Sequence, residues 1–313
     1  MRTAVLALGG NALSRSDEPA TVTNQFRHAR ESVAPIVELA RQGWRIVIVH
    51  GNGPQVGDEL VRNEAARRLA EPLPLGVLVA ETAGWIGYML QQSLQNALAD
   101  ARIQRDVVTV ISQTLVDRYD PALSAPTKPI GHPLSAQQAA SLRELGRAVG
   151  KDGGGAWRRM AASPTPLGVI EFPVIKRLLE LGAIVITAGG GGTPVYQDPI
   201  LGLEGIDAVV DKDRVSAILA SQLEAEVLMI LTNVDAVFEG WGTPDARPIR
   251  RMSVEQAERM IAGGALDAGG MRPKIEAAAG FVKRGGMRAI IARLEAGPAA
   301  LREETGTTIM RPS

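Results

Sequence analysis

The feature that most constrains the fold is a series of short apolar segments separated by helix-forming stretches. Residues 3–8 and 45–49 are the first two, and alanine, leucine, valine and isoleucine dominate both. Strands without an alternating polar face are typical of a parallel sheet that helices cover on both sides. Further segments of this kind occupy residues 107–111, 183–187, 227–231 and 288–292. With helices expected over 23–42, from near Gln55 and over 77–101, the sequence predicts an α/β fold.

Glycine clusters follow three of these segments: Gly9-Gly10-Asn11, Gly51-Asn52-Gly53 and Gly189 to Gly192. Ligands of open parallel sheets bind beyond the carboxyl ends of the strands. Glycines there let backbone N–H groups approach an anion, and the next helix adds partial positive charge. A single cluster is equally explained as a tight strand–helix turn, but three together indicate an anion site. None matches the P-loop or the dinucleotide-binding glycine motif.

Composition excludes several classes of function. The 34 basic residues balance 34 acidic ones, which argues against nucleic acid or an anionic membrane as a partner. The absence of cysteine excludes disulfides, thiol catalysis and Cys-based metal sites, and fits a cytoplasmic protein. His28, His50 and His132 are not paired at metal-ligand spacing. No apolar run approaches the roughly 18 residues of a membrane span, so we expect none.

Lysine is rare, since only six of the 34 basic residues are lysines. Lys212 lies in the triplet Asp211-Lys212-Asp213, and Lys274 follows a glycine pair and precedes a helix-forming segment. Phosphoryl transfer requires placed cations to neutralise the transferring oxygens, with carboxylates to hold those cations or a metal. The alternative is a set of solvated surface charges. Taken with the glycine clusters, the lysines favour phosphoryl transfer.

The stretch from Asp117 to about Pro166 differs from the rest of the chain. It is rich in proline, contains Gly153-Gly-Gly155 and lacks a clean buried strand. We interpret it as an insertion or lid, and the alternative is a long surface loop with one helix over 136–148. The glycine-rich region 189–205 is the best candidate for a linker between domains.

Eight motifs, in order along nearly the whole chain, resemble those of the carbamate kinases within the amino acid kinase family. The segment from His50 to Gly57, HGNGPQVG, is the longest and most specific of them. Chance agreement of eight ordered motifs is negligible. They occupy residues 7–12, 50–57, 127–131, 157–159 with 163–166, 189–194, 210–213, 231–235 and 271–278.

The resemblance implies a three-layer αβα sandwich with a mainly parallel open sheet of about eight strands and a small protruding lid. Residues 1–205 would form the phosphoryl-acceptor part, with the lid at about 117–166, and residues 206–313 the nucleotide part. The implied reaction is ATP + carbamate ⇌ ADP + carbamoyl phosphate in a homodimer, with Mg²⁺ held mainly by the nucleotide phosphates. Carbamoyl phosphate is a strong phosphoryl donor, so we expect the reaction to run toward ATP in a catabolic pathway such as arginine catabolism.

Three lysines and one carboxylate in these motifs are the expected catalytic residues. Lys212 and Lys274 would neutralise the transferring phosphoryl group, and Asp213 would hold both ammonium groups. Lys128 would close over the acceptor from the lid, unless it is a solvated loop lysine. Asp211 is a weaker candidate for positioning a lysine or a metal. No general base is needed, because carbamate is already an anionic nucleophile.

Two further groups of residues are expected to bind ligands. Donors to the phosphoryl group and the carbamate are expected from Gly9, Gly10, Asn11, Gly51, Asn52 and Gly53. The nucleotide is expected to be bordered by Asp211, Thr232, Asn233, Val234, Asp235 and Met271. His50 is expected to cap or pack a strand end rather than act in catalysis. Phe238 or Trp241 would either stack on adenine or pack in the core.

Three positions depart from the family pattern: His132-Pro133, Ala83-Gly-Trp85 and Met160-Ala-Ala162. The first two lie near the expected acceptor site or lid. A kinase of the same fold that acts on another small carboxylate or carbamate-like acid therefore stays open as an alternative. A non-catalytic nucleotide-binding regulator is disfavoured, because it would be free to lose the lysines and Asp213.

Overall fold

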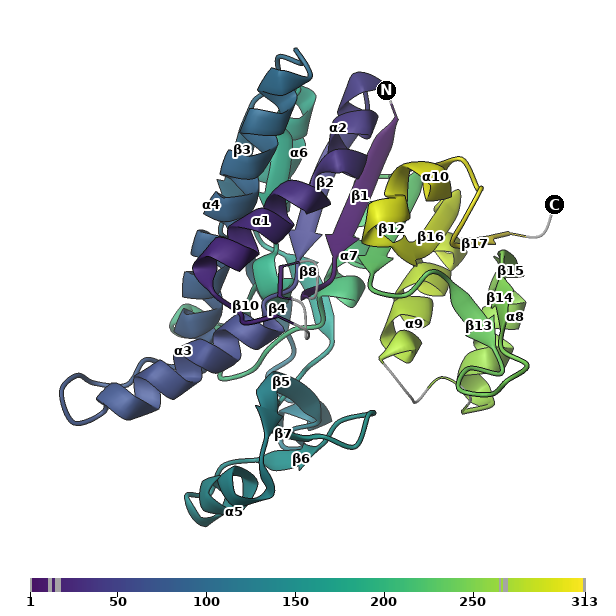
Figure 1. The fold of residues 1–313 in the computed structure, drawn as a ribbon. Coiled ribbons are helices and arrows are strands. Elements are labelled where there is room, and N and C mark those ends of the chain that lie inside the picture. The colour runs from purple at the N-terminus through teal and green to yellow at the C-terminus, as the bar shows by residue number, and fades with distance from the viewer. Residues whose placement is uncertain (1, 11–12, 15–17, 265, 267–269, 312–313) are drawn as a thin grey trace.

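The computed structural model of the chain describes residues 2–10, 13–14, 18–264, 266 and 270–311. Its centre is an eight-stranded sheet whose neighbouring strands are all parallel except for one pair (Figure 1). In spatial order the strands are β15 (Arg251–Ser253), β17 (Thr307–Met310), β16 (Arg288–Arg293), β12 (Val227–Thr232), β1 (Thr3–Leu8), β2 (Arg45–His50), β9 (Ile184–Thr187) and β3 (Val107–Val110). The antiparallel pair is β16 and β17. All six apolar segments form strands of this sheet, which confirms the predicted fold class.

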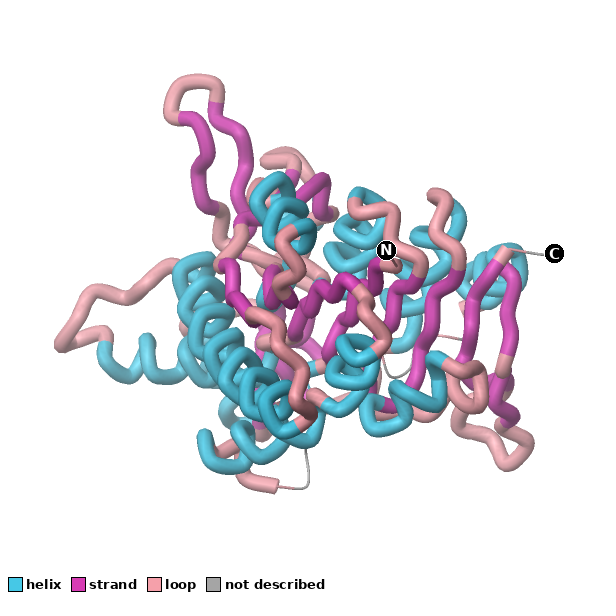
Figure 2. The backbone as a smooth tube through the Cα atoms, turned by 90° about the horizontal axis from the view of Figure 1, so that it is seen from above, coloured by secondary structure: helices cyan, strands magenta, loops and turns pink. Residues whose placement is uncertain are grey.

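Helices cover both faces of the sheet and make three layers (Figure 2). One face is covered by α1 (Val22–Ser32), α2 (Ala34–Arg41), α4 (Leu75–Asp100) and α10 (Gly297–Leu301). The other is covered by α6 (Phe172–Glu180), α7 (Lys212–Gln222), α8 (Val254–Ala262) and α9 (Met271–Lys283). Successive side chains of a strand serve opposite faces, so Leu6 packs in one core while Val5 and Ala7 pack in the other. The central strands are therefore apolar throughout.

The first predicted helix, over residues 23–42, is in fact two helices, because α1 and α2 meet at Val33. Pro35 lies in the first turn of α2, where a missing N–H leaves no helical hydrogen bond unmade. Within an unbroken helix the same proline would have removed a hydrogen bond and crowded the preceding turn. No helix of the described residues, the 26-residue α4 included, has the length and hydrophobicity that crossing a bilayer requires.

The predicted lid is a small subdomain with its own antiparallel sheet, and it projects from the body (Figure 1). The sheet contains β5 (Lys128–Leu134), β7 (Trp157–Ala161) and β6 (Val149–Lys151), with α5 (Ala136–Glu144) beside it. The alternative of a long loop with one helix is therefore wrong. These strands escaped prediction because they are mostly half-exposed and β5 contains two prolines. Proline is tolerated there because β5 is an edge strand.

The lid is inserted between two paired strands of a second sheet. That sheet has the order β11 (Gly202–Gly205), β10 (Thr193–Asp198), β4 (Gln113–Val116) and β8 (Pro166–Val169), and β4 pairs antiparallel with β8. Region 189–205, expected as a linker, is instead a tight turn followed by the β10–β11 hairpin. The remaining elements are α3 (Gly53–Ala66), the hairpin β13 (Val237–Glu239) and β14 (Arg247–Ile249), and 3-10 turns at Pro121–Leu123, Gly189–Gly191 and Leu294–Ala296.

Helix α3 carries the lid through a close backbone contact flanked by ion pairs. A Cβ atom on Gly57 of α3 would lie 2.0 Å from the Cα atom of Gly131 in β5. Further along the helix, Glu64 accepts two hydrogen bonds of 2.8 Å from the guanidinium of Arg159. His132 lies 3.2 Å from Asp58 of the same helix. The departure at His132 thus lies at the contact between lid and helix.

We expect Gly57→Ala to destabilise the protein by about 1–3 kcal/mol, because the new methyl group forces the lid and α3 apart. The helical preference of alanine over glycine, about 1 kcal/mol, offsets part of this loss. Gly168→Ala is the matched control, since a Cβ atom there meets nothing within 4 Å. Urea unfolding of both variants measures the effect, and equal midpoints would contradict the proposed close contact.

Candidate active site

The carboxyl ends of β1, β2 and β12 meet at one edge of the sheet and open into a cavity of about 580 Å³. The loops after β1 and β2 nearly touch, since a Cβ atom on Gly51 would lie 2.9 Å from the backbone nitrogen of Gly10. The lid and the first turns of α7 and α9 close the cavity on its other sides. The predicted residues that line it are Gly9, Gly10, Gly51, Asn52, Gly53, Lys128, Asp211, Lys212, Asp213, Thr232, Asn233 and Lys274.

Asp213 lies between two lysines that come from different helices. It accepts a hydrogen bond of 2.5 Å from Lys212 Nζ and one of 2.9 Å from Lys274 Nζ. Burial favours the neutral acid, but the two ammonium charges hold the pKa of Asp213 far below its ordinary value. The carboxylate is therefore an anion that fixes both lysines at the cavity wall.

The two lysines respond to this shared carboxylate in opposite ways. Burial, together with repulsion from Lys274, lowers the pKa of Lys212. Burial acts on Lys274 as well, but the attraction of Asp213 outweighs it and raises the pKa of Lys274. Lys212 is thus the more readily neutralised of the pair, and an anion bound between them would favour the charged state of both.

Asp211 links the lid to the body. One of its carboxylate oxygens caps α7 by accepting from the backbone N–H groups of Asp213 and Arg214, at 3.0 and 3.2 Å. The other oxygen forms an ion pair with Lys128 of the lid strand β5. Burial opposes the anion, yet Lys128 holds the pKa of Asp211 below its usual value. Lys128, which precedes Asp211 by 83 positions in the sequence, therefore reaches the cavity through the lid.

The third glycine cluster serves packing as much as ligand access. Of that cluster, Gly190 lines the cavity, and its φ of +67° favours glycine. A Cβ atom there would lie 2.3 Å from the side-chain nitrogen of Asn52, which itself donates to Thr82 at 2.9 Å. His50 is buried at the end of β2, where burial lowers its pKa to about 4. This histidine packs the strand end.

Not every predicted residue reaches the cavity. Val234, Asp235 and Met271 are not among its lining residues, and Asp235 instead bonds Arg293 at 2.6 Å. Asn11 lies outside the described residues. Phe238 and Trp241 contact each other, with ring centroids 5.2 Å apart, and do not line the cavity either. Stacking of either ring on adenine stays a prediction.

Sequence reasoning missed Arg158, Ser163 and Arg214, which all line the cavity. Arg158 and Ser163 belong to the lid motif, but the motif alone does not tell which of Arg158 and Arg159 faces the site. The alternation of side chains along a strand would have shown that only one of the two arginines faces the site, because neighbouring residues point to opposite sides. The lid strand itself was not predicted, so the signal could not be used.

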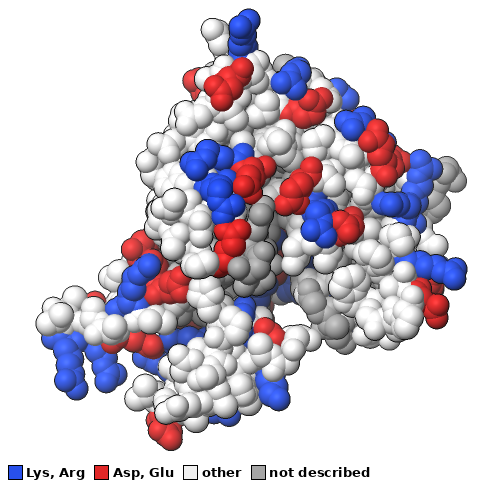
Figure 3. All heavy atoms as spheres, viewed as in Figure 1, with Lys and Arg blue, Asp and Glu red and all other residues white. Residues whose placement is uncertain are grey.

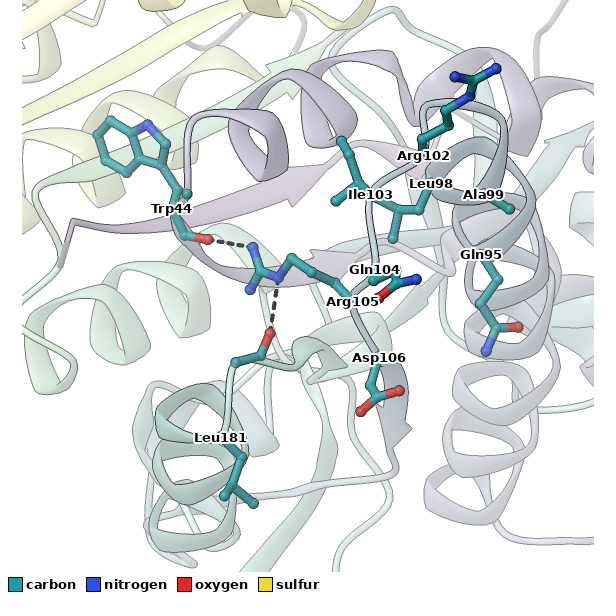
Figure 4. Close-up of a pocket in the computed structure, with 12 residues that line it drawn as sticks. Trp44, Gln95, Leu98, Ala99, Arg102, Ile103, Gln104, Arg105, Asp106 and Leu181 are labelled. Atoms are coloured by element: carbon teal, nitrogen blue, oxygen red, sulfur yellow. Dashed lines mark hydrogen bonds between the residues drawn. The ribbon is translucent and has the colours of Figure 1, made fainter.

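A second cavity, of about 990 Å³, lies at the opposite, amino ends of β2, β3 and β9 (Figure 4). Its most prominent polar group is Arg105, which donates to the carbonyl oxygens of Trp44 at 2.6 Å and Gly182 at 2.9 Å. Burial lowers the pKa of Arg105. The guanidinium joins three loops that precede strands, so we interpret it as a structural cross-link.

The charge of the site contrasts with that of the surface. Basic and acidic side chains are interspersed over the face seen in Figure 3. The described residues that line the site cavity include five cations, Lys128, Arg158, Lys212, Arg214 and Lys274, but only two carboxylates, Asp211 and Asp213. An excess of positive charge on the cavity wall, beside backbone amides, suits a phosphorylated ligand.

Comparison with known proteins agrees with this chemistry. The chain is 42% identical to the carbamate kinase of Pyrococcus horikoshii, over 97% of its own length and 98% of that protein. It is 39% identical to a carbamate kinase-like protein of Escherichia coli, over 98% of both chains. The structure of Giardia lamblia carbamate kinase bound to citric acid superimposes with a TM-score of 0.94 at 34% identity, covering 99% of each chain.

The amino acid kinase family model matches residues 2–293, which include every loop and helix start that borders the cavity. The resemblance found in the eight motifs is thereby confirmed over nearly the whole chain. The chain belongs to the amino acid kinase family and is an ATP-dependent phosphotransferase.

Proposed function

We propose that this protein is a carbamate kinase that catalyses the reversible reaction ATP + carbamate ⇌ ADP + carbamoyl phosphate. The observation that carries the proposal is the pair of lysines joined by Asp213, which faces two glycine loops and a lid lysine across one cavity. The 42% identity to the Pyrococcus horikoshii carbamate kinase supports the choice of acceptor.

The proposed mechanism is positioning and electrostatics. The ammonium groups of Lys212 and Lys274 neutralise the oxygens of the phosphoryl group as it transfers, and Asp213 keeps both in place. Backbone N–H groups of the loops at 9–10 and 51–53 contact the phosphoryl group. Carbamate attacks as an anion, so the protein needs to move no proton. Exclusion of water from the cavity would strengthen each of these interactions.

The two substrates are proposed to occupy different parts of the chain. Residues 1–205, with Lys128 on the lid, hold the carbamate, and residues 206–313 hold the nucleotide. Support for the second half comes from Thr232, the last residue of β12, and Asn233, which follows it, since both line the cavity. Val234, Asp235 and Met271 are close neighbours in sequence of lining residues and remain proposed nucleotide contacts.

Magnesium is the proposed metal, and it would neutralise charge between the phosphates of the nucleotide. The described residues contain no group of three or more His, Asp or Glu side chains able to hold a metal ion. The carboxylates of Asp211 and Asp213 are already engaged by lysines. These residues fit an ion that would be held mainly by the nucleotide phosphates.

The second candidate is a kinase of the same fold acting on another small carboxylate. The carbamate kinase-like protein of Escherichia coli, which is as similar as several carbamate kinases, keeps this candidate open. Two of the departures from the family pattern, by their positions, give it no further support. His132 lies beside Asp58 on α3. Trp85 is a residue of α4 and packs against the hydrophobic core between that helix and the sheet. Neither is among the described residues that line the cavity, so we do not expect either to contact the acceptor.

The cellular setting is also part of the proposal. Carbamoyl phosphate is a mixed anhydride, so the reaction would run toward ATP when a catabolic pathway such as arginine catabolism supplies it in the cytoplasm. A homodimer is proposed because β3 is an edge strand of the large sheet. Ile111, which directly follows β3, and Tyr88, on the neighbouring helix α4, are exposed apolar side chains. Light scattering would test the oligomer.

Lys274→Met should lower the turnover number for ATP formation about 10²- to 10³-fold while changing ADP affinity less than about threefold. The reason is that the ammonium group acts mainly on charge that develops during transfer. Lys283→Met is the matched control, because Lys283 is an exposed residue of the same helix paired with Glu258. Initial rates and calorimetric ADP binding measure both variants. Turnover of Lys274→Met near that of the control would refute the assigned role.

The acceptor should be small and singly charged. Rapid ATP formation is expected from ADP and carbamoyl phosphate, slower formation from acetyl phosphate, and no phosphorylation of glutamate, aspartate or N-acetylglutamate. The only carboxylates lining the described cavity are tied to lysines, so the ammonium group of an amino acid would be buried unpaired. Phosphorylation of an amino acid, with no ATP from carbamoyl phosphate, would establish the second candidate instead.

Lys128→Met should raise the KM for carbamoyl phosphate about tenfold and leave the KM for ADP nearly unchanged. The lysine reaches the cavity from the lid, which is proposed to serve the acceptor. Lys151→Met, at an exposed lid position in β6, is the control. If the KM for ADP rose as much as that for carbamoyl phosphate, the division of the site into two parts would be wrong.

A further inference from the structure

Two adjacent arginines of lid strand β7 serve opposite sides of the lid. Arg159 points toward α3, where it forms two hydrogen bonds of 2.8 Å with Glu64. Arg158 is half-buried and lines the site cavity. Because side chains alternate along a strand, Arg159 can hold the lid against α3 while Arg158 faces the site.

Arg158 has one buried guanidinium nitrogen without a hydrogen-bond partner. Its Nε atom is buried and makes no hydrogen bond with any described residue. The nearest carboxylate oxygen is Oδ2 of Asp152, at 3.7 Å, and Oδ1 of Asp152 accepts from the backbone N–H groups of Gly154 and Ala156. A buried donor without an acceptor is costly, so an incoming ligand that supplies oxygen atoms would be favoured.

The other cations of the cavity already have hydrogen-bonded carboxylates. Lys128 pairs with Asp211, and the two remaining lysines pair with Asp213. Arg214 bonds Glu276 at 3.1 Å. Among the described cations that line the cavity, Arg158 therefore stands apart in having no hydrogen-bonded carboxylate.

The chemistry of the side chain indicates what it binds. A guanidinium presents parallel N–H groups whose spacing matches the two oxygens of a carboxylate or phosphate. Lys128 and Ser163, also contributed by the lid segment, line the same cavity. We propose that Arg158 binds the oxyanion of the acceptor, carbamate in one direction and carbamoyl phosphate in the other, which rests on the proposed function.

This role makes Arg158 a substrate-binding residue rather than part of the phosphoryl-neutralising pair. Arg158→Gln should raise the KM for carbamoyl phosphate about 10- to 100-fold, as expected for loss of a charged hydrogen bond, with the KM for ADP changed less than about threefold. Addition of methylguanidinium to Arg158→Ala should restore part of the lost affinity, because the cavity left by the side chain admits the free cation.

The control is Arg143→Gln, since Arg143 lies on α5 and stacks on Trp157 outside the cavity, 4.3 Å from the ring centroid. It should keep the wild-type KM for both substrates. A KM of Arg158→Gln for carbamoyl phosphate within twofold of wild type would overturn the inference. So would an equal rise of both KM values without rescue by methylguanidinium, which would assign Arg158 to lid stability.

Binding without turnover separates this inference from the proposed function. Carbamoyl phosphate alone should raise the midpoint of thermal unfolding of wild type and of Arg143→Gln, but not that of Arg158→Gln. If wild type forms no ATP yet is protected in this Arg158-dependent way, the oxyanion site stands and the proposed reaction fails. Equal protection of all three proteins would overturn the site even if wild type forms ATP.

Discussion

The arrangement of the site depends on one carboxylate placed between two ammonium groups. Asp213 comes from the start of α7 and Lys274 from the first turn of α9, so their contact fixes the spacing of two helices as well as of two charges. Two lysines packed this closely would repel each other and shed a proton without the anion between them. Asp213 therefore keeps the site cationic before substrate arrives, and the substrate meets charges that need little rearrangement.

The core of the fold could be predicted from the sequence because burial on both faces leaves a plain signal. Each of the six apolar runs is a strand of the main sheet, and β1 and β2 begin and end within one residue of expectation. The edge strand β15 and its neighbour β17 were missed, since they are short and carry polar residues such as Ser253 and Thr308. The lid strands were missed for a related reason, because half-exposed strands with prolines lack a continuous apolar run.

The candidate site was predictable where a rare residue type stands in a motif, as with Lys128, Lys212 and Lys274. The site was not predictable where a residue's role depends on contacts made in the folded structure. The sequence does not tell that Asp211 both caps α7 and meets a lid lysine, because the two partners are separated by 83 positions. Nor does it tell which of two consecutive arginines faces the cavity, since that depends on the pleat of an unrecognised strand.

Strand β1 lies between β2 and β12, so a single sheet runs without interruption beneath both halves of the proposed site. Its hydrogen-bonded register spans Thr3 to Leu8 on one side and Ala4 to Leu8 on the other. A hinge between the two halves would have to shear these ladders in the driest part of the molecule. We therefore expect the body to stay rigid throughout the catalytic cycle. Movement of the lid alone would then admit and release the ligands.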